Sequence, residues 1–258
     1  MTIQPIWTRQ YDQLPVAVYE NNEALGRAAA HDMSAILQAA LAERGEANLI
    51  LATGNSQLTF LHTLKQIEGI DWAAVRVFHM DEYIGIDPQH RASFPLFLRT
   101  HFFDSVTPRA FYPVPGGADD VDAACREYEA LLREYPADAV ALGIGENGHI
   151  AFNEPPANFD DPKWVKVVEL DDISRQQQVN EGHFDRLEDV PTQAITLTIP
   201  ALLAAKRMLC LAPEKRKAQI VWACLLEPVD PMRPASILRQ NGHARLYLDR
   251  DSAAKLDV

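Results

Sequence analysis

The chain has 258 residues, 47% of them hydrophobic and 23% charged, which is ordinary for a soluble globular enzyme. Its formal net charge of -12 argues against a nucleic acid as partner, because the electrostatic attraction that dominates such binding becomes a repulsion. Three cysteines without a CxxC pair indicate reduced thiols rather than disulfides or a cysteine metal site. The first residues lack the apolar core of a signal peptide, and no apolar run approaches the length that crosses a bilayer. We therefore expect a cytoplasmic protein without membrane contact.

Hydrophobic periodicity predicts that strands and helices alternate along the chain. The expected helices are 22–44, which Gly45 ends, 57–67, 93–103 and 119–135. The expected strands are 49–52, 75–80, the apolar stretch that starts at Asp138, 165–170, 194–199, 208–212 and 245–248. This alternation implies an α/β fold with a mostly parallel sheet and helices on both faces. No linker rich in Pro, Gly or Ser divides it, so we expect one domain over residues 1–258.

Ligands of such sheets bind beyond the carboxyl ends of the strands, and polar or glycine-marked segments follow three of the predicted strands. The first is "ATGNSQ", which contains Thr53, Gly54, Asn55 and Ser56 between a strand and a helix. Exposed backbone N–H groups and the helix dipole suit a phosphate there. The alternative is that Ser56 or Asn55 caps the helix while Gly54 makes the turn.

The second segment is "FHMDEY", in which Asp81 and Glu82 follow a buried strand. A carboxylate is costly there unless it is hydrogen-bonded or useful. Beside a desolvated pocket its pKa is raised toward the range in which it can accept a carbon-bound proton. A carboxylate that simply bonds loop amides is an equal alternative from the sequence.

The third segment, "GIGENGHIAFNEPP", places His149 and Glu154 on a glycine-rich loop. A histidine can move a proton to or from a sugar oxygen near neutral pH, and a nearby carboxylate orients it and stabilises its charged form. A catalytic reading is favoured over a structural loop here. A zinc site is less favoured, because no second His or Cys lies at ligand spacing in this segment. His79 or Asp81 could complete such a site only if the fold brought them close to His149.

Basic residues follow another predicted strand in "APEKRKAQ", which contains Lys215, Arg216 and Lys217. A cation at that strand end could neutralise a phosphate, and a solvated helix start is the alternative.

Together these segments resemble the glucosamine-6-phosphate deaminase (isomerase) family, whose relatives include the 6-phosphogluconolactonases. The family's "MDEY" is present unchanged, its "DGHIAFNEP" appears as "NGHIAFNEP", and its TGxTP phosphate turn is similar to "TGNSQ". The resemblance covers nearly the whole chain and implies a modified Rossmann-like fold. The lactonase branch is less similar, since it typically lacks the MDEY string and the "AFNEP" that follows the GH pair.

The resemblance implies a role for each matching residue. Asp81 would move a proton between C2 and C1 of the opened sugar through a cis-enolamine. His149 would open the pyranose ring with Glu154 as its carboxylate partner, and no cofactor or metal is required. The phosphate would bind Thr53, Gly54, Asn55 and Ser56.

The sequence departs from the family pattern near the site. Asn147 stands where the family has an aspartate, so a neutral amide replaces the charge that usually stabilises the His149 imidazolium. Glu154 must then supply that electrostatic stabilisation. The family's phosphate-binding arginine falls at Gly182, for which His183 or Arg175 could substitute. Lys215 is then the best match to the family's phosphate lysine. The segment after Pro155 lacks the pattern of the allosteric members.

We therefore expect a small-molecule sugar phosphate as partner and conversion of glucosamine 6-phosphate, or a close hexosamine 6-phosphate, to a ketose 6-phosphate and ammonia. A 6-phosphogluconolactonase-type hydrolase and a non-catalytic sugar-phosphate sensor are the alternatives. The sequence leaves the substrate epimer and a homo-oligomeric state open.

Overall fold

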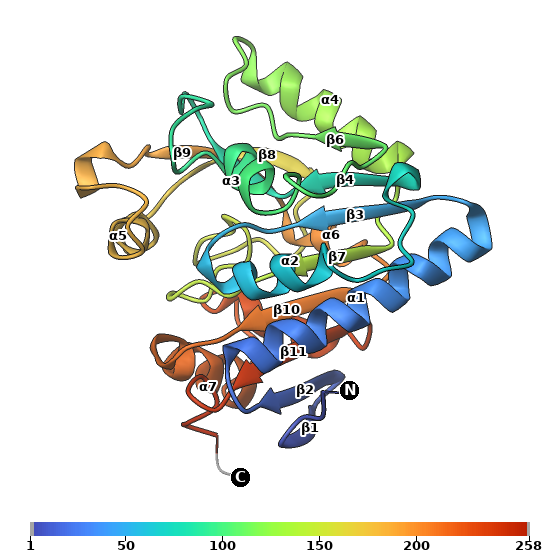
Figure 1. Cartoon of the computed structure of the whole chain (residues 1–258). Coiled ribbons are helices and arrows are strands. Elements are labelled where there is room, and N and C mark those ends of the chain that lie inside the picture. The colour runs from blue at the N-terminus through green and yellow to red at the C-terminus, as the bar shows by residue number, and fades with distance from the viewer. Residues whose placement is uncertain (1–2, 257–258) are drawn as a thin grey trace.

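The computed structural model describes residues 3–256, and a large sheet of eight strands forms its centre (Figure 1). The strand order is β1 (Trp7–Tyr11), β2 (Leu14–Tyr19), β11 (Ala244–Asp249), β10 (Met208–Ala212), β7 (Ala139–Leu142), β3 (Ala47–Leu51), β4 (Val75–His79) and β6 (Ala110–Tyr112). All neighbours pair in parallel except β1 and β2. The predicted mostly parallel sheet is confirmed.

Helices cover both faces of this sheet, as the alternation predicted. Alternate residues of β3 separate the two sides, since Leu49 and Leu51 belong to one hydrophobic core and Ile50 to the other. The first core contains α1 (Asn22–Arg44), α2 (Leu58–Leu64) and α3 (Phe94–His101). The second contains α4 (Val121–Glu134), α6 (Ile199–Leu203) and α7 (Ala218–Leu226). Because strand side chains alternate between faces, β2, β11, β10, β7, β3 and β4 each contribute residues to both cores.

The first helix has the predicted bounds because the sequence caps both of its ends. The Asn21 side chain accepts a hydrogen bond from the Ala24 N–H, and Gly45 adopts the left-handed conformation that ends the helix.

Two predicted strands lie outside the main sheet. β8 (Val165–Glu169) and β9 (Gln193–Leu197) pair antiparallel with each other, and β9 also pairs with β5 (Asp81–Tyr83). Their assignment to a parallel sheet was wrong. β5 begins two residues after β4 ends, so the chain leaves the main sheet there and offers a new edge to β9. Val165, Ile195 and Leu197 still pack into the second core of the large sheet.

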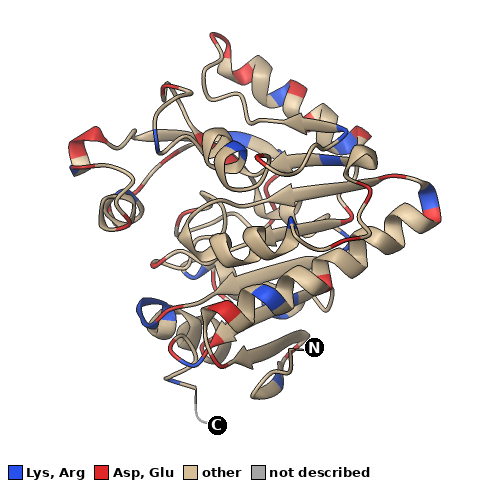
Figure 2. Ribbon diagram, in the orientation of Figure 1, with Lys and Arg blue, Asp and Glu red and all other residues tan. Residues whose placement is uncertain are grey.

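The parallel strands end on the side of the molecule where α5 (Asp172–Asn180) lies, at the left of Figure 1. Figure 2 shows that β3, β7 and β10 are free of charged residues, whereas the loops beyond their ends carry both signs. Within residues 3–256, no helix combines the length and the apolar character needed to span a membrane.

Candidate active site

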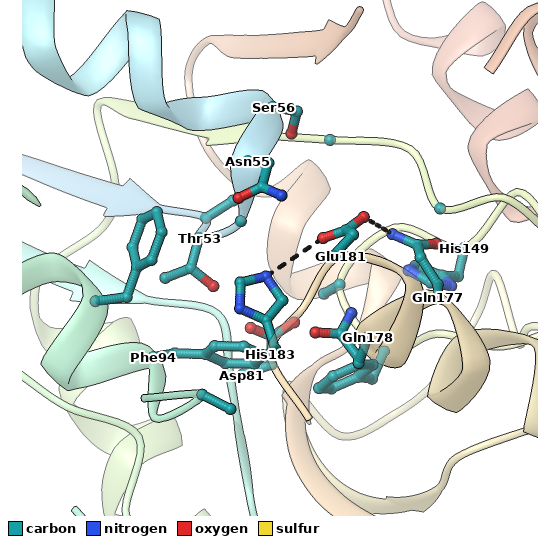
Figure 3. Close-up of a pocket in the computed structure, with 18 of the residues that line it drawn as sticks. Thr53, Asn55, Ser56, Asp81, Phe94, His149, Gln177, Gln178, Glu181 and His183 are labelled. Carbon is teal, nitrogen blue, oxygen red and sulfur yellow. Dashed lines mark hydrogen bonds and ion pairs between the residues drawn. The ribbon is translucent and has the colours of Figure 1, made fainter. Parts of the chain in front are cut away.

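A pocket lies at the carboxyl ends of β3, β4, β7 and β10, and α5 forms part of its wall (Figure 3). It therefore collects segments that are far apart in the sequence. The residues that line it include Thr53, Gly54, Asn55, Ser56, Asp81, Arg91, Phe94, Gly145, His149, Gln177, Glu181, His183, Arg216 and Lys217.

The "TGNSQ" turn faces this pocket with all four of its predicted phosphate-facing residues. Gly54 has a φ of 96°, a conformation that side chains disfavour, and the short 3-10 helix η1 (Asn55–Gln57) starts directly after it. Gln57 is fully buried, and its Nε2 donates to Ser56 Oγ at 3.1 Å and to the Leu142 carbonyl at 3.5 Å. Gln57 thus ties the turn to the end of β7.

Asp81 is a buried carboxylate that lines the pocket. It is 8% exposed, and burial, with a smaller contribution from the Glu82 carboxylate, raises its pKa well above the ordinary value. Within residues 3–256, no group donates a hydrogen bond to its carboxylate oxygens. A raised pKa and free oxygens suit a group that accepts a proton from carbon.

The adjacent carboxylate, Glu82, has a different environment. Its Oε1 accepts from the Tyr83 N–H at 2.9 Å, and its Oε2 accepts from Ser93 Oγ at 3.0 Å and the Phe94 N–H at 3.1 Å. Burial nevertheless outweighs these bonds and raises the pKa of Glu82 to about 7. Glu82 thereby holds the first residue of α3, Phe94, which lines the pocket.

The imidazole ring of His149 packs directly against the backbone of Gly145 in the same loop. A Cβ atom at position 145 would lie 2.2 Å from the imidazole Cε1, so only glycine leaves room for the ring. The Gly145 N–H donates to the His149 carbonyl at 2.9 Å, which closes the loop around the side chain.

The Nδ1 atom of His149 has two polar neighbours, Ser174 Oγ at 2.9 Å and Glu154 Oε2 at 3.4 Å. Burial alone would raise the pKa of Glu154, but His149 and hydrogen bonds from Ser174 and Asn147 outweigh it, so the pKa is lowered. The structure therefore joins His149 and Glu154 as the sequence suggested. Ser174 was not anticipated, because it comes from α5, 25 residues further along the chain.

The basic segment after β10 enters the pocket through two of its three cations. Arg216 and Lys217 line the pocket, whereas Lys215 is exposed and does not. Lys217 is 4% exposed, and burial, together with the nearby Arg216 charge, lowers its pKa to about 8. Lys215, which the sequence assigned to the phosphate, thus lies outside the pocket lining, whereas Lys217, at the end of the 3-10 helix η4 (Lys215–Lys217), is part of it.

The two substitutes expected for the Gly182 position lie in different places. His183 lines the pocket and its Nε2 is 3.5 Å from Glu181 Oε2. Arg175 is not in the pocket lining and instead donates to the carbonyls of Leu187 and Val190 at 2.8 and 3.1 Å. It stabilises the loop that follows α5.

Glu181 brings an unexpected negative charge into the pocket. It accepts hydrogen bonds from Arg216 at 2.7 Å and Gln177 at 2.8 Å. Burial alone would raise its pKa, but the hydrogen bond from His183 and the Arg216 charge lower it to about 2. Glu181 is therefore ionised near neutral pH and balances part of the positive charge.

No group of three or more His, Cys, Asp or Glu side chains in residues 3–256 is arranged to hold a metal ion.

Comparisons with known proteins agree on one family. The model of the family glucosamine-6-phosphate isomerases/6-phosphogluconolactonase matches residues 20–248. The glucosamine-6-phosphate deaminase of Exiguobacterium sibiricum is 38% identical over 206 residues, which are 80% of each chain. That of Bacillus pumilus is 34% identical and covers 92% of this chain and 97% of its own.

Solved structures agree with this match. The structure of a monomeric glucosamine-6-phosphate deaminase has a TM-score of 0.86 and 31% identity, covering 93% of this chain and 98% of its own. A 6-phosphogluconolactonase from Thermotoga maritima has a TM-score of 0.73 at 18% identity, covering 91% and 98%, and shows the shared fold alone.

Proposed function

The chain belongs to the glucosamine-6-phosphate isomerase/6-phosphogluconolactonase family, and we propose that it is an enzyme that deaminates glucosamine 6-phosphate, or a close hexosamine 6-phosphate, to a ketose 6-phosphate and ammonia. The observation that carries this proposal is the pairing in one pocket of a buried carboxylate free of hydrogen bonds, Asp81, with a carboxylate-supported imidazole, His149. Ring opening and proton transfer at carbon need two such groups in different positions.

His149 opens the pyranose ring. The C1–O5 bond breaks, a carbonyl forms at C1, and the proton of the O1 hydroxyl is moved to O5 through the imidazole. Glu154 lies 3.4 Å from Nδ1 and stabilises the imidazolium that exists while the proton is in transit.

Asp81 then transfers a proton between carbons. Its carboxylate removes the proton from C2 while O1 gains the proton that the substrate ammonium group loses, which gives a neutral enolamine. The proton held by Asp81 then returns at C1, which leaves an iminium ion at C2. Water adds to the iminium ion, and ammonia leaves with formation of the ketone. Because the pKa of Asp81 is raised, its carboxylate is a stronger base than an exposed aspartate would be.

The phosphate of the substrate binds where the "TGNSQ" turn and Lys217 line the pocket. The turn residues from Thr53 to Ser56 offer polar groups, and Lys217 supplies a buried positive charge. Glu181 neutralises Arg216, so Lys217 is the cation with the fewest competing carboxylates. We assign the main ion pair of the phosphate to Lys217.

Ammonia release from glucosamine 6-phosphate and galactosamine 6-phosphate, measured side by side, tests the proposal. The Asp81→Asn variant should lose ~10²-fold or more of the rate, which is the usual effect of removing a catalytic base. If the wild type releases ammonia from one of the two sugars and Asp81→Asn does not, both the reaction and the substrate epimer are established. Binding of both sugars without ammonia release overturns it in favour of a sensor, and hydrolysis of 6-phosphogluconolactone by Asp81→Asn at the full rate does so in favour of a lactonase.

Two finer points stay within the proposal. We propose that the chain acts as one domain in the cytoplasm, because a doubly charged substrate does not cross bilayers unaided. A homo-oligomer stays a prediction, and a monomeric relative of the same fold exists.

A further inference from the structure

Asn147 joins the ring-opening histidine to helix α5. Its Oδ1 accepts a hydrogen bond from the His149 N–H at 3.0 Å, and its Nδ2 donates to Glu154 Oε2 at 2.6 Å and Asp171 Oδ2 at 2.8 Å. The amide has only one favourable orientation, because the reverse would set its oxygen against two carboxylates. A neutral donor at position 147 therefore holds two negative charges together beside the imidazole.

Asp171 reaches this amide from the first turn of α5. It is the N-cap of the helix, where its Oδ1 accepts from the Ser174 N–H at 2.6 Å and its second oxygen remains for Asn147. Ser174, one turn on, contacts His149 Nδ1 at 2.9 Å through its hydroxyl. The first turn of α5 thus contacts both the amide and the imidazole. A further bond of 3.1 Å runs from the Glu146 N–H to Gln177 Oε1 in the same helix.

We propose that Asp171 and Ser174 are positioning residues for ring opening, and that Asp171 supplies to the His149 environment the negative charge that Asn147 does not carry. This inference rests on the proposed function. Ser174 and Glu154 occupy Nδ1, so Nε2 is the nitrogen that exchanges protons with the sugar. Asp171 acts through Asn147, which fixes the Glu154 carboxylate and the His149 backbone in one arrangement.

The two carboxylates that face position 147 require a neutral hydrogen-bond donor there. An aspartate there would keep the bond from the His149 N–H, but its other oxygen would face the carboxylates of Glu154 and Asp171 at hydrogen-bond distance. Three carboxylates at such distances cannot all stay ionised in place. The acidic residue that is isosteric with Asn147 should therefore damage the site, and removal of the Asp171 charge should relieve part of the damage.

Single variants in the full chain test the role of the Asp171 charge. Asp171→Asn retains helix capping, since asparagine caps as well as aspartate, and should lower kcat by ~5-fold or more with little change in KM. Asp172→Asn is the matched control, because it removes the same charge from the same turn while its side chain is 79% exposed and pairs with Arg175. It should stay within about twofold of the wild type. Equal kcat in Asp171→Asn and wild type would overturn the proposal.

The charge exchange is the decisive measurement. Asn147→Asp should lose ~10-fold or more in kcat, and Asn147→Asp/Asp171→Asn should recover several-fold of it, which a merely structural role would not produce. Additive losses in the double variant, or a gain in Asn147→Asp alone, would overturn the inference. Thermal unfolding of the wild type, Asn147→Asp, Asp171→Asn and the double variant establishes that each is folded.

Ring opening can also be observed without deamination. In the Asp81→Asn background, exchange between the anomers of glucosamine 6-phosphate, followed by NMR, reports His149 alone. Ser174→Ala, which favours the helix, should slow this exchange by ~10-fold, and an unchanged rate would exclude Ser174 from positioning. Absence of ammonia release by the wild type refutes the proposed function, whereas an active wild type with these variants unaffected refutes only the inference.

Discussion

The imidazole of His149 packs so closely on Gly145 that a Cβ there would lie 2.2 to 2.4 Å from three ring atoms. The backbone of Gly145 does not have a positive φ, so alanine fits the loop conformation and only the ring must move. We expect Gly145→Ala to lower kcat/KM by ~10²-fold, because displacement of a catalytic group by about 1 Å has effects of this size. Steady-state kinetics measure it.

Gly117→Ala is the matched control for this substitution. Nothing lies within 4 Å of a Cβ atom at position 117, and its φ is not positive either. Its kcat/KM should equal that of the wild type. Equal activity of Gly145→Ala and Gly117→Ala would show that the loop relaxes and that the position of the ring is not limiting.

Lys215 and Lys217 offer a direct comparison between the sequence assignment and the structure. Lys217→Met removes the buried charge of the pocket and should raise KM by about 30-fold or more, the usual effect of losing one partner of a buried ion pair. Lys215→Met should change KM by less than about twofold, because Lys215 is exposed and outside the pocket. The opposite ranking would restore the assignment made from the sequence.

The pH dependence of KM gives a second test of Lys217. Burial lowers the pKa of Lys217 to about 8 in the free enzyme, so the side chain loses its proton as the pH rises through that value. The substrate phosphate is already a dianion there, since its second pKa is about 6. KM should therefore rise between pH 7 and 9 in the wild type, and this part of the rise should vanish in Lys217→Met. A wild-type KM that is flat over this range would contradict the assignment.

The two lysines also illustrate where sequence reasoning reached its limit. The strand β10 and the cationic cluster after it were predicted, because apolar runs and charges are local signals. Which cation turns inward depends on the 3-10 turn over residues 215–217, and three consecutive basic residues give no periodicity from which to choose.

In the site and the fold as well, features with a local sequence signal were predicted and features that depend on distant contacts were not. Asp81, His149 and the turn at Thr53 were predicted from motifs at strand ends, and the structure brings them into one pocket. Asp171 and Ser174 were missed because their partners lie 24 and 25 residues away in sequence and no local pattern marks the contact. The edge strand β1 was missed because most of its residues are exposed, which leaves no apolar run to detect.

Glu82 should contribute to stability more than to chemistry. Both of its carboxylate oxygens accept hydrogen bonds from backbone N–H groups, so the amide nitrogen of a glutamine would face a donor whichever way it turned. Glu82→Gln should lower the free energy of unfolding by about 1–3 kcal/mol at pH 8, as expected for a buried donor left without an acceptor. Urea unfolding measures this value. Unchanged stability would indicate that Glu82 is protonated at that pH and already behaves as a neutral group.

We expect Glu181 to limit the affinity of the pocket for anions, because it is ionised and accepts a hydrogen bond from Arg216 at 2.7 Å. Glu181→Gln removes that charge, so the positive field of Arg216 and Lys217 is less compensated. Inhibition by inorganic phosphate should then tighten on the order of 5-fold. Glu214→Gln is the matched control, since Glu214 also pairs with Arg216 at 2.8 Å but lies outside the pocket lining with its side chain 40% exposed. Solvent screens that pair, and phosphate inhibition should change by less than about twofold. Weaker inhibition in Glu181→Gln would mean that the carboxylate orients Arg216 toward the anion rather than competing with it.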